Sequence, residues 1–512
     1  MDARTQDFVD TFRAFLEEVV HREGVPDGSL SAIGEIVQEH LGVPVAELPA
    51  LTQVIASHRL VDADLALAEL ARLATADAAG SDGAAGPDGA TGSDAAATVL
   101  GIAAGHMRDQ ASFTELLAGS RHHAFVPGPV DYVSVPDGPD SVRRVISFGL
   151  HLLTFRGVPV VALQRAAMPE RGRAGASVEV LSPDPLVAEA FLVELKRLML
   201  SLSVLRGQVL SFTGNEYGNS AAGATFLPRP RVAADDVILA PGVLESISRH
   251  VVGVGLHRER LLAAGQHLKR GVLLYGPPGT GKTLTVRHLL SVTPETTAVL
   301  LTGTSIRFIT EAAELARAMQ PAIVVLEDVD LVASERGLHG PQPLLFAVLD
   351  ALDGLDGDAD VAFVLTTNRV EVLERALAER PGRVDLAVEV GLPDDEARRR
   401  LFRRYAEGLP FTEGALDAAA AAASGTTGSF AKELIRRAVL AGAEEGRDAS
   451  DDDLAAALDG LLASSAQLTR SLLGGSGRGD DSSADDAEVV LGTHYEGAWV
   501  AYAPHSGTTF SP

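Results

Sequence analysis

Eight consecutive residues near the middle of the chain have the types and spacing that bind a polyphosphate. They match the pattern GxxxxGK[ST], whose glycines let successive backbone N–H groups point at phosphate oxygens. In this pattern the lysine reaches the β- and γ-phosphates, and the hydroxyl that follows it binds Mg²⁺. The residues are Gly276, Pro277, Pro278, Gly279, Thr280, Gly281, Lys282 and Thr283, and we add the next residue, Leu284, to the predicted binding site.

The segments on either side of this loop supply the context that the pattern needs. Residues 271–275 are mostly apolar and predict a buried strand, whereas residues 284–290 predict a helix. The N-terminus of that helix adds a partial positive charge next to the phosphates. We therefore predict that the loop binds a nucleoside triphosphate together with Mg²⁺.

Acidic residues follow a second apolar run, residues 323–326, which also predicts a buried strand. Glu327, Asp328 and Asp330 come at or just after its end. Carboxylates at the end of a strand parallel to the first can hold Mg²⁺ through water and polarise an attacking water. We predict that Glu327 and Asp328 both take part in catalysis and that both, with Thr283, bind Mg²⁺. A solvated strand end is the alternative.

Two further polar features follow in the same half of the chain. Two threonines and then Asn368 follow the apolar run 361–365. The amide of Asn368 could form a hydrogen bond to a γ-phosphate or to the attacking water. Arg380 and Arg383 flank a Pro-Gly turn that suits their presentation to a neighbouring phosphate. A turn-forming asparagine and a solvated loop are the respective alternatives.

Taken together, these motifs resemble the AAA+ ATPase family, and within it the AAA clade. The loop at 276–283, the acids at 327–330, Thr366-Thr367-Asn368 and Arg380-Pro381-Gly382-Arg383 occur in that family's order. Upstream, Asp236 and Val237 stand where the family's adenine pocket begins. Downstream, Gly428 and Ser429 stand in a segment similar to its lid sensor.

The resemblance implies a P-loop fold of a five-stranded parallel sheet, in the order 5-1-4-3-2, with an α-helical lid. It also implies a homo-oligomeric ring, usually a hexamer, with ATP at the subunit interfaces. Asn368 would then be the first sensor, and Arg380 and Arg383 would act on the adjacent subunit. The expected client is a protein.

Three positions depart from the family pattern. Glu327-Asp328 replaces the usual Asp-Glu, and the shorter aspartate at the base position predicts slow hydrolysis, because a base must lie within hydrogen-bond reach of its water. Residues 302–321 lack the aromatic–aliphatic–glycine pore signature, and Arg307-Phe308-Ile309 is the nearest substitute. Ser429 stands where the clade usually has alanine.

Composition shifts divide the chain into six predicted regions. Residues 1–74 show helical periodicity, and residues 75–97 are an Asp/Gly/Ala/Ser-rich linker. Residues 98–232 predict a mixed α/β domain, including strands near 145–155 and 158–163 and a long helix from 185 to about 205. The ATPase core is expected at 233–410, the helical lid at 411–468, and a mostly disordered tail at 469–512.

The net charge and the absence of cysteine exclude several classes of protein. A formal charge of −26 disfavours nucleic acid and anionic membranes as partners. It also disfavours a motor that acts on DNA, because such a protein needs a basic surface. Zero cysteines exclude disulfides and fit a cytoplasmic location. The first residues lack the pattern of a signal peptide, and the most apolar stretch, 145–163, is broken by polar residues and proline.

Two functions remain open from the sequence. The first is an Mg²⁺-dependent ATP-hydrolysing ring that remodels a protein client, with residues 1–232 recognising the client or an adaptor. The second is a slow or inactive switch that assembles with ATP and serves as a scaffold. The order of Glu327 and Asp328 and the missing pore signature motivate the second.

Overall fold

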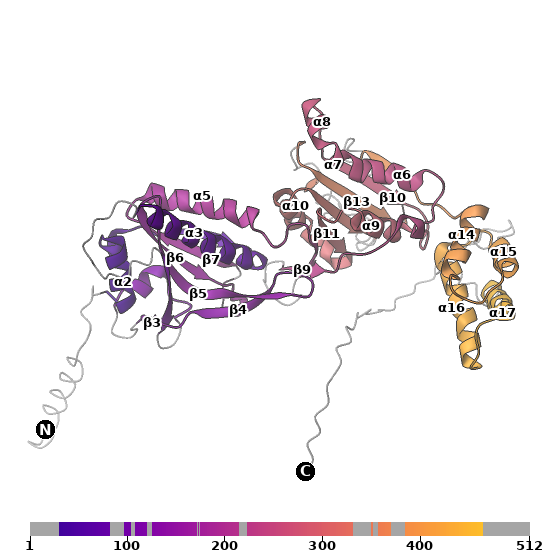
Figure 1. The fold of residues 1–512 in the computed structure, drawn as a ribbon, viewed down its shortest axis with the longest axis horizontal. Helices are drawn as coiled ribbons and strands as arrows, with labels where there is room; N and C mark the ends of the chain where they lie inside the picture. Colours follow the sequence, from indigo (N-terminus) through magenta and orange to yellow (C-terminus); the bar gives the residue numbers. More distant parts are fainter. Residues whose placement is uncertain are drawn as a thin grey trace, which may run out of the picture.

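A computed structural model describes residues 30–81, 97–103, 108–119, 125–171, 173, 175–213, 223–330, 350–351, 357–369 and 384–463. Within these ranges three parts follow one another along the long axis in chain order (Figure 1). They are an N-terminal α/β part, a second sheet with its helices, and a bundle of helices. No helix in the described ranges combines the length and apolar character that crossing a bilayer needs.

The N-terminal part is built on a seven-stranded sheet in the order β1-β7-β6-β5-β2-β3, with β4 also pairing to β5. Helices α3 and α5 cover one face and share an apolar core with it, whereas α2 and α4 cover the other (Figure 1). The strands are β1 (Leu51–Ile55), β2 (Ala97–Ala103), β3 (Val126–Gly128), β4 (Asp131–Pro136), β5 (Val142–Phe155), β6 (Val158–Arg165) and β7 (Ala176–Leu181). The helices are α2 (Ala32–Leu41), α3 (Leu60–Ser81), α4 (Phe113–Leu117) and α5 (Pro185–Ser201).

The predicted division of the N-terminal half differs from this arrangement. Residues 1–74 were expected to be helical, yet β1 lies within them and pairs antiparallel with β7. Helix α3 continues to Ser81, so it enters the segment predicted as a linker. The described residues on both sides of that segment therefore share one sheet. The periodicity of apolar residues along the chain does not reveal which distant strand a short segment will pair with, because strand pairing depends on the tertiary structure.

The second sheet contains the predicted nucleotide-binding core. Its strands β14, β10, β13, β12 and β11 are parallel neighbours, which confirms the expected order 5-1-4-3-2. Helices α6 and α9 bury one face, and α10 buries the other. The strands are β10 (Arg270–Tyr275), β11 (Thr297–Thr302), β12 (Ala322–Glu327), β13 (Val361–Thr367) and β14 (Leu386–Glu389); the helices are α6 (Val243–Ser248), α9 (Lys282–Ser291) and α10 (Ile309–Ala318).

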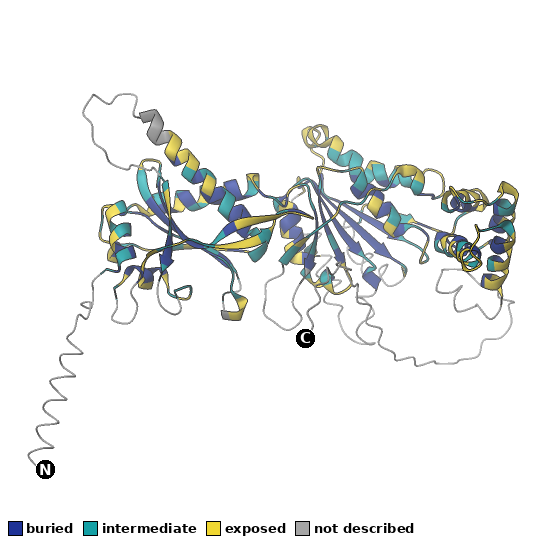
Figure 2. Ribbon diagram, turned by 60° about the horizontal axis from the view of Figure 1, so that its bottom comes forward, coloured by how far each residue is buried: buried dark blue, intermediate teal, exposed yellow. Residues whose placement is uncertain are grey.

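Two strands from the region predicted as the preceding domain extend this sheet to seven. β8 (Val209–Thr213) pairs parallel with β11, and β9 (Gly223–Leu227) pairs antiparallel with β8. The predicted boundary at 232 therefore falls after two strands that belong to the nucleotide-binding sheet. Figure 2 shows this sheet as a buried layer between helices whose outer faces are exposed.

Contacts next to β8 join the first two parts. The guanidinium of Arg206 donates to the Gln320 carbonyl at 2.6 Å, and the ring of His58 packs edge-on against Phe212 with 5.9 Å between centroids. Phe212 is buried in the core of the second sheet. The N-terminal part is thus attached to the nucleotide-binding sheet by packing as well as by the chain.

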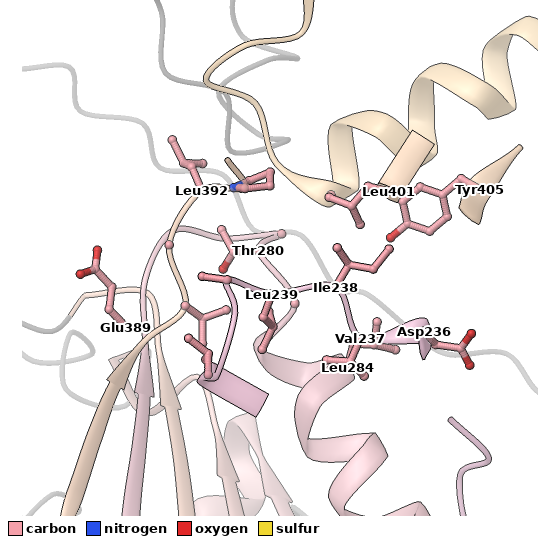
Figure 3. A pocket seen from close by; sticks show the side chains of 18 residues that line it. Asp236, Val237, Ile238, Leu239, Thr280, Leu284, Glu389, Leu392, Leu401 and Tyr405 are labelled. Atoms are coloured by element: carbon pink, nitrogen blue, oxygen red, sulfur yellow. The ribbon is translucent and has the colours of Figure 1, made fainter. Parts of the chain in front are cut away.

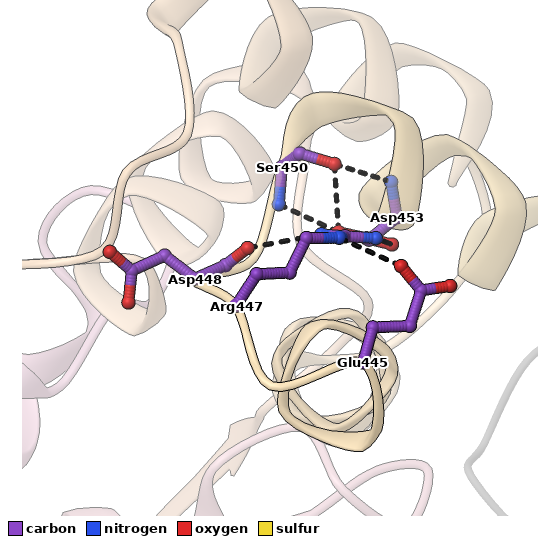
Figure 4. A network of polar contacts seen from close by, with 5 residues as sticks. All are labelled: Glu445, Arg447, Asp448, Ser450 and Asp453. Atoms are coloured by element: carbon purple, nitrogen blue, oxygen red, sulfur yellow. Dashed lines mark hydrogen bonds and ion pairs between the residues drawn. The ribbon is translucent and has the colours of Figure 1, made fainter.

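Four helices, which we call the lid, follow the second sheet and are described as far as residue 463. The sequence placed the lid at 411–468, whereas the first of the four helices, Asp395–Tyr405, lies within the region predicted as the ATPase core and packs with the other three. They pack around an Ala- and Leu-rich core that includes Phe402 and Phe430. Arg447 bonds both carboxylate oxygens of Asp453 and also pairs with Glu445, which ties the turn between the last two helices (Figure 4). The helices are α14 (Asp395–Tyr405), α15 (Glu413–Ala422), α16 (Gly428–Glu444) and α17 (Asp451–Leu462).

Candidate nucleotide-binding site

The predicted phosphate-binding loop connects β10 to α9, as the sequence requires. Gly276, Gly279 and Gly281 have φ angles of 142°, 78° and 113°, a region that other residues rarely adopt. A Cβ atom on Gly276 would lie 2.3 Å from the Val390 carbonyl oxygen. The loop therefore needs glycine both for its backbone angles and for its close approach to the segment after β14.

Lys282 is buried at the start of α9, and its ammonium lies inside the loop. Its Nζ donates to the carbonyl oxygens of Gly276 at 2.7 Å and Pro277 at 2.8 Å. Burial lowers the pKa of Lys282, while the charges of Asp328 and Asp330 act in the opposite direction. The ammonium is thus held where phosphate oxygens can replace the two carbonyl oxygens as acceptors.

Thr283 and Glu327 meet across the gap between the loop and β12. The Thr283 hydroxyl lies close enough to the Glu327 carboxylate to lower the pKa of that carboxyl. Burial raises the pKa of Glu327, and the charge of Asp328 raises it further, while Thr283 and Arg287 oppose the shift. A hydroxyl and a carboxylate are hard oxygen donors of the kind that Mg²⁺ binds through a few contacts, its other ligands being water and phosphate. Thr283 and Glu327 therefore fit the predicted Mg²⁺ ion. The described residues contain no cluster of three His, Cys, Asp or Glu side chains that could hold a metal, and an Mg²⁺ ion bound mainly by phosphate and water does not need one.

Asp328 is held from β13 at two points. Its backbone N–H donates to Thr366 Oγ1 at 3.0 Å, and its Oδ1 accepts from Asn368 Nδ2 at 3.2 Å. Its φ of 51° is left-handed, which is uncommon for a non-glycine residue. The structure thus brings the predicted base and the predicted sensor into direct contact. The contact of Asn368 with phosphate or water stays a prediction.

The third acid, Asp330, has a different environment from the other two. It is buried, and its Oδ1 accepts hydrogen bonds from Thr367 Oγ1 at 2.9 Å and from the Asn368 backbone N–H at 3.1 Å. Asp330 therefore fixes the end of β13 and the position of Asn368. Neither Thr366 nor Thr367 had a predicted role, although two hydroxyl groups at the end of a buried strand indicate that they form hydrogen bonds there.

A cavity of about 260 Å³ opens beside the loop, between the sheet and the lid (Figure 3). Predicted residues Asp236, Val237, Leu284 and Gly428 line it, together with loop residues Gly279, Thr280 and Gly281. The lid adds Leu401 and Tyr405, and burial raises the pKa of Tyr405. Sequence reasoning missed these two, although they lie four apart on a strongly amphipathic helix and so share one face. A mostly apolar cavity next to a phosphate loop suits a nucleobase.

The lid touches the loop and the rim of this cavity directly. The Ser429 backbone N–H donates to the Gly279 carbonyl at 3.2 Å, and a Cβ on Gly279 would lie 2.6 Å from Ser429 Oγ. Ser429 thus contacts the phosphate loop rather than the cavity. The guanidinium of Arg404 in α14 pairs with Asp236, which draws the lid toward the opposite rim.

The remaining predicted residues, Arg380 and Arg383, lie outside the described residues. Their role as fingers stays a prediction. In the described part of the chain, the phosphate loop, the acids, Asn368 and the lid segment all meet at one edge of the sheet.

Comparison with known proteins agrees with this geometry. Residues 272–392 match the family model described as "ATPase family associated with various cellular activities (AAA)". The chain is 34% identical over 301 residues to the ATP-dependent zinc metalloprotease FtsH 2 of Sphaerobacter thermophilus, covering 53% of this chain and 46% of that protein. It is 32% identical over 208 residues to the proteasome-activating nucleotidase of Methanoculleus marisnigri, covering 38% of this chain and 50% of that protein.

A third relative is the 26S proteasome regulatory subunit S10B homolog B of Arabidopsis thaliana, 35% identical over 168 residues, or 30% of this chain and 42% of that subunit. The chain therefore spans about half the length of the curated relatives it matches. His-Glu-x-x-His, the helical zinc-protease motif, does not occur in the sequence. The match to the family model, residues 272–392, lies within the nucleotide-binding part.

Proposed function

Since this chain carries an ATPase module of the AAA family, we propose that it binds ATP with Mg²⁺, hydrolyses it, and uses the cycle to remodel a protein client. One observation carries the proposal. The ends of β10, β12 and β13 bring Lys282, Thr283, Glu327, Asp328 and Asn368 together beside the cavity, with the hydrogen bonds described above.

Each side chain has a task in the proposed reaction. Lys282 and the loop N–H groups bind the β- and γ-phosphates, while Thr283 and Glu327 hold Mg²⁺, which neutralises phosphate charge when bound. Asp328 accepts a proton from the attacking water as a general base, and Asn368 orients the Asp328 carboxylate. The apolar cavity holds the base of the nucleotide.

The steady-state ATPase rate of the wild type and a Lys282→Ala variant tests this proposal. We expect turnover by the wild type and at least about a hundredfold loss in the variant, because the lysine contributes charge that is needed as the γ-phosphate leaves. An equal, near-zero rate in both, with ATP-dependent assembly intact, would instead support the second candidate. That candidate is a slow switch or scaffold, and the short side chain of Asp328 at the base position favours it.

Assembly into a ring, hexameric as in the family pattern, is also proposed. Arg380 and Arg383 would then act on ATP bound to the adjacent subunit. Mixing Arg383→Ala subunits with Lys282→Ala subunits tests this arrangement, because some interfaces in a mixed ring combine an intact loop with an intact arginine. We expect partial recovery of ATPase activity, and no recovery in demonstrated mixed oligomers would contradict a finger acting in trans.

The N-terminal part is proposed to recognise the client or an adaptor, and the location is proposed to be the cytoplasm. The packing of this part against β8, which extends the ATPase sheet, supports a role in passing force or conformation between them. A pulldown with an Asp328→Asn variant, which should retain ATP and bound clients, would identify the partner. Equal recovery by the wild type and by a variant without the N-terminal part would contradict this assignment.

A further inference from the structure

The backbone of Asp328 is in a conformation that its neighbours must impose. Two non-glycine residues in the described part of the chain have positive φ, Arg156 and Asp328, both at 51°. Arg156 forms a two-residue turn with Gly157 between β5 and β6, where a hairpin requires this conformation. Asp328 follows β12 directly and lies in no hairpin. Left-handed backbone outside a turn persists where surrounding contacts hold it, and such residues cluster at active sites.

The contact that holds this backbone comes from Thr366. The parallel ladder between β12 and β13 ends at the pair Leu326 and Leu365. Beyond it, the N–H of Asp328 donates to Thr366 Oγ1 at 3.0 Å instead of to a strand carbonyl. Thr366 is 1% exposed, so water does not readily replace its hydroxyl as the acceptor.

The side chain of Asp328 has little freedom to correct an error in its backbone. An aspartate carries one methylene between the backbone and the carboxyl group, so the position of Cα and the φ angle decide where the carboxylate lies. A general base must come within about 2.6–3.2 Å of the water it activates. The amide of Asn368 holds the Oδ1 atom, and Thr366 holds the N–H on the other side.

We propose that Thr366 is a positioning residue for ATP hydrolysis, which holds the Asp328 backbone in its left-handed conformation so that the short carboxylate reaches the attacking water. This inference rests on the proposed function, because it assigns Asp328 the role of base. Thr366 is not among the residues that line the cavity, and its hydroxyl accepts the Asp328 N–H, so we assign its effect to Asp328.

The test compares Thr366→Val, Thr366→Ser and a matched control, Thr297→Val, in the full chain with Mg²⁺-ATP. Thr297 is also a buried threonine of this sheet whose Oγ1 accepts a backbone N–H, that of Gly207 at 3.0 Å, but it lies at the start of β11. We expect Thr366→Val to lower kcat about tenfold with KM within about twofold, because the lost bond serves the transition state rather than ATP binding. Thr366→Ser and Thr297→Val should keep kcat within about twofold of the wild type.

The same substitution in an Asp328→Asn variant distinguishes a positioning role of Thr366 from a general structural effect. In Asp328→Asn the base is absent, so adding Thr366→Val should lower the residual rate no further. If Thr366→Val does not fold, Thr366→Ala makes the same comparison, because it also removes the acceptor. A further loss in the Asp328→Asn background, an unchanged kcat in Thr366→Val, or an equal loss in Thr366→Ser would each overturn the inference while leaving wild-type hydrolysis established. A wild type without turnover would overturn the proposed function and this inference with it.

Discussion

At Gly279 the phosphate loop and the lid are in direct contact, so replacement of Gly279 by alanine tests the packing of the site. The left-handed φ of 78° costs an alanine about 1–2 kcal/mol. The added Cβ would lie 2.6 Å from Ser429 Oγ, 2.8 Å from Ser429 Cβ and 3.0 Å from Thr427 Oγ1. Overpacking of this kind costs about 1–3 kcal/mol.

The clash can be relieved only by moving the loop or the lid, and the nucleotide is proposed to bind between them. If the whole overpacking cost of about 1–3 kcal/mol weakens ATP binding, the Kd for Mg²⁺-ATP rises about 5- to 140-fold in Gly279→Ala, since 1.4 kcal/mol is tenfold. Adding Ser429→Gly removes both nearest atoms, so the double variant should bind about tenfold more tightly than Gly279→Ala. Equilibrium titration with a fluorescent ATP analogue measures these affinities.

Two other glycines with positive φ angles provide controls. Gly265 has φ of 69° and nothing within 4 Å of its would-be Cβ, so Gly265→Ala should lower the free energy of unfolding by about 1 kcal/mol and leave the Kd unchanged. In Gly276→Ala the clash is with the Val390 backbone at 2.3 Å, and Ser429→Gly should not relieve it. A double variant Gly279→Ala/Ser429→Gly that binds no better than Gly279→Ala would refute the contact between loop and lid.

Three further predictions follow from charged groups at the site. Burial raises the pKa of Glu327 above 4.5, so the ionised carboxylate destabilises the fold as the pH rises through that raised pKa. Glu327→Gln should therefore raise the melting temperature of the nucleotide-free protein at pH 7, and this gain should disappear below about pH 4.5. An equal gain at both pH values in thermal scans would contradict the assignment. Arg404→Gln breaks the partly exposed ion pair with Asp236, so it should change the free energy of unfolding by less than about 1 kcal/mol yet speed ATP release roughly threefold in stopped-flow measurements. The control is Arg403→Gln, which should leave the rate of ATP release unchanged because its partners Glu413 and Asp417 lie within the lid. Asp330→Asn weakens the acceptor for Thr367 and the Asn368 N–H, so kcat should fall about tenfold with the Kd for ATP kept, and a loss of binding instead would place Asp330 at the phosphates.

The sequence predicted three strands of the parallel core, residues 271–275, 323–326 and 361–365, because each is a short apolar run that leads into predicted site residues. The strand order β14-β10-β13-β12-β11 agrees with the expectation from the family resemblance. The predictions for the N-terminal half were less complete. β1 and the β8–β9 hairpin join sheets whose other strands lie far away in sequence, and periodicity carries no information about such partners.

In the candidate site, too, some features follow from the local sequence and others only from the tertiary structure. Eight contiguous residues determine the phosphate loop, because its shape depends on local φ angles that glycine permits and on a lysine at a set distance along one helix. Only the tertiary structure decided that Thr366 bonds Asp328, that Asp330 fixes Asn368, that Tyr405 lines the cavity, and that Ser429 contacts the phosphate loop. These contacts depend on the register between neighbouring strands and on how a separate helical bundle packs against the loop. Local residue types determine that a phosphate can bind here, whereas long-range packing determines where the short Asp328 carboxylate stands relative to it.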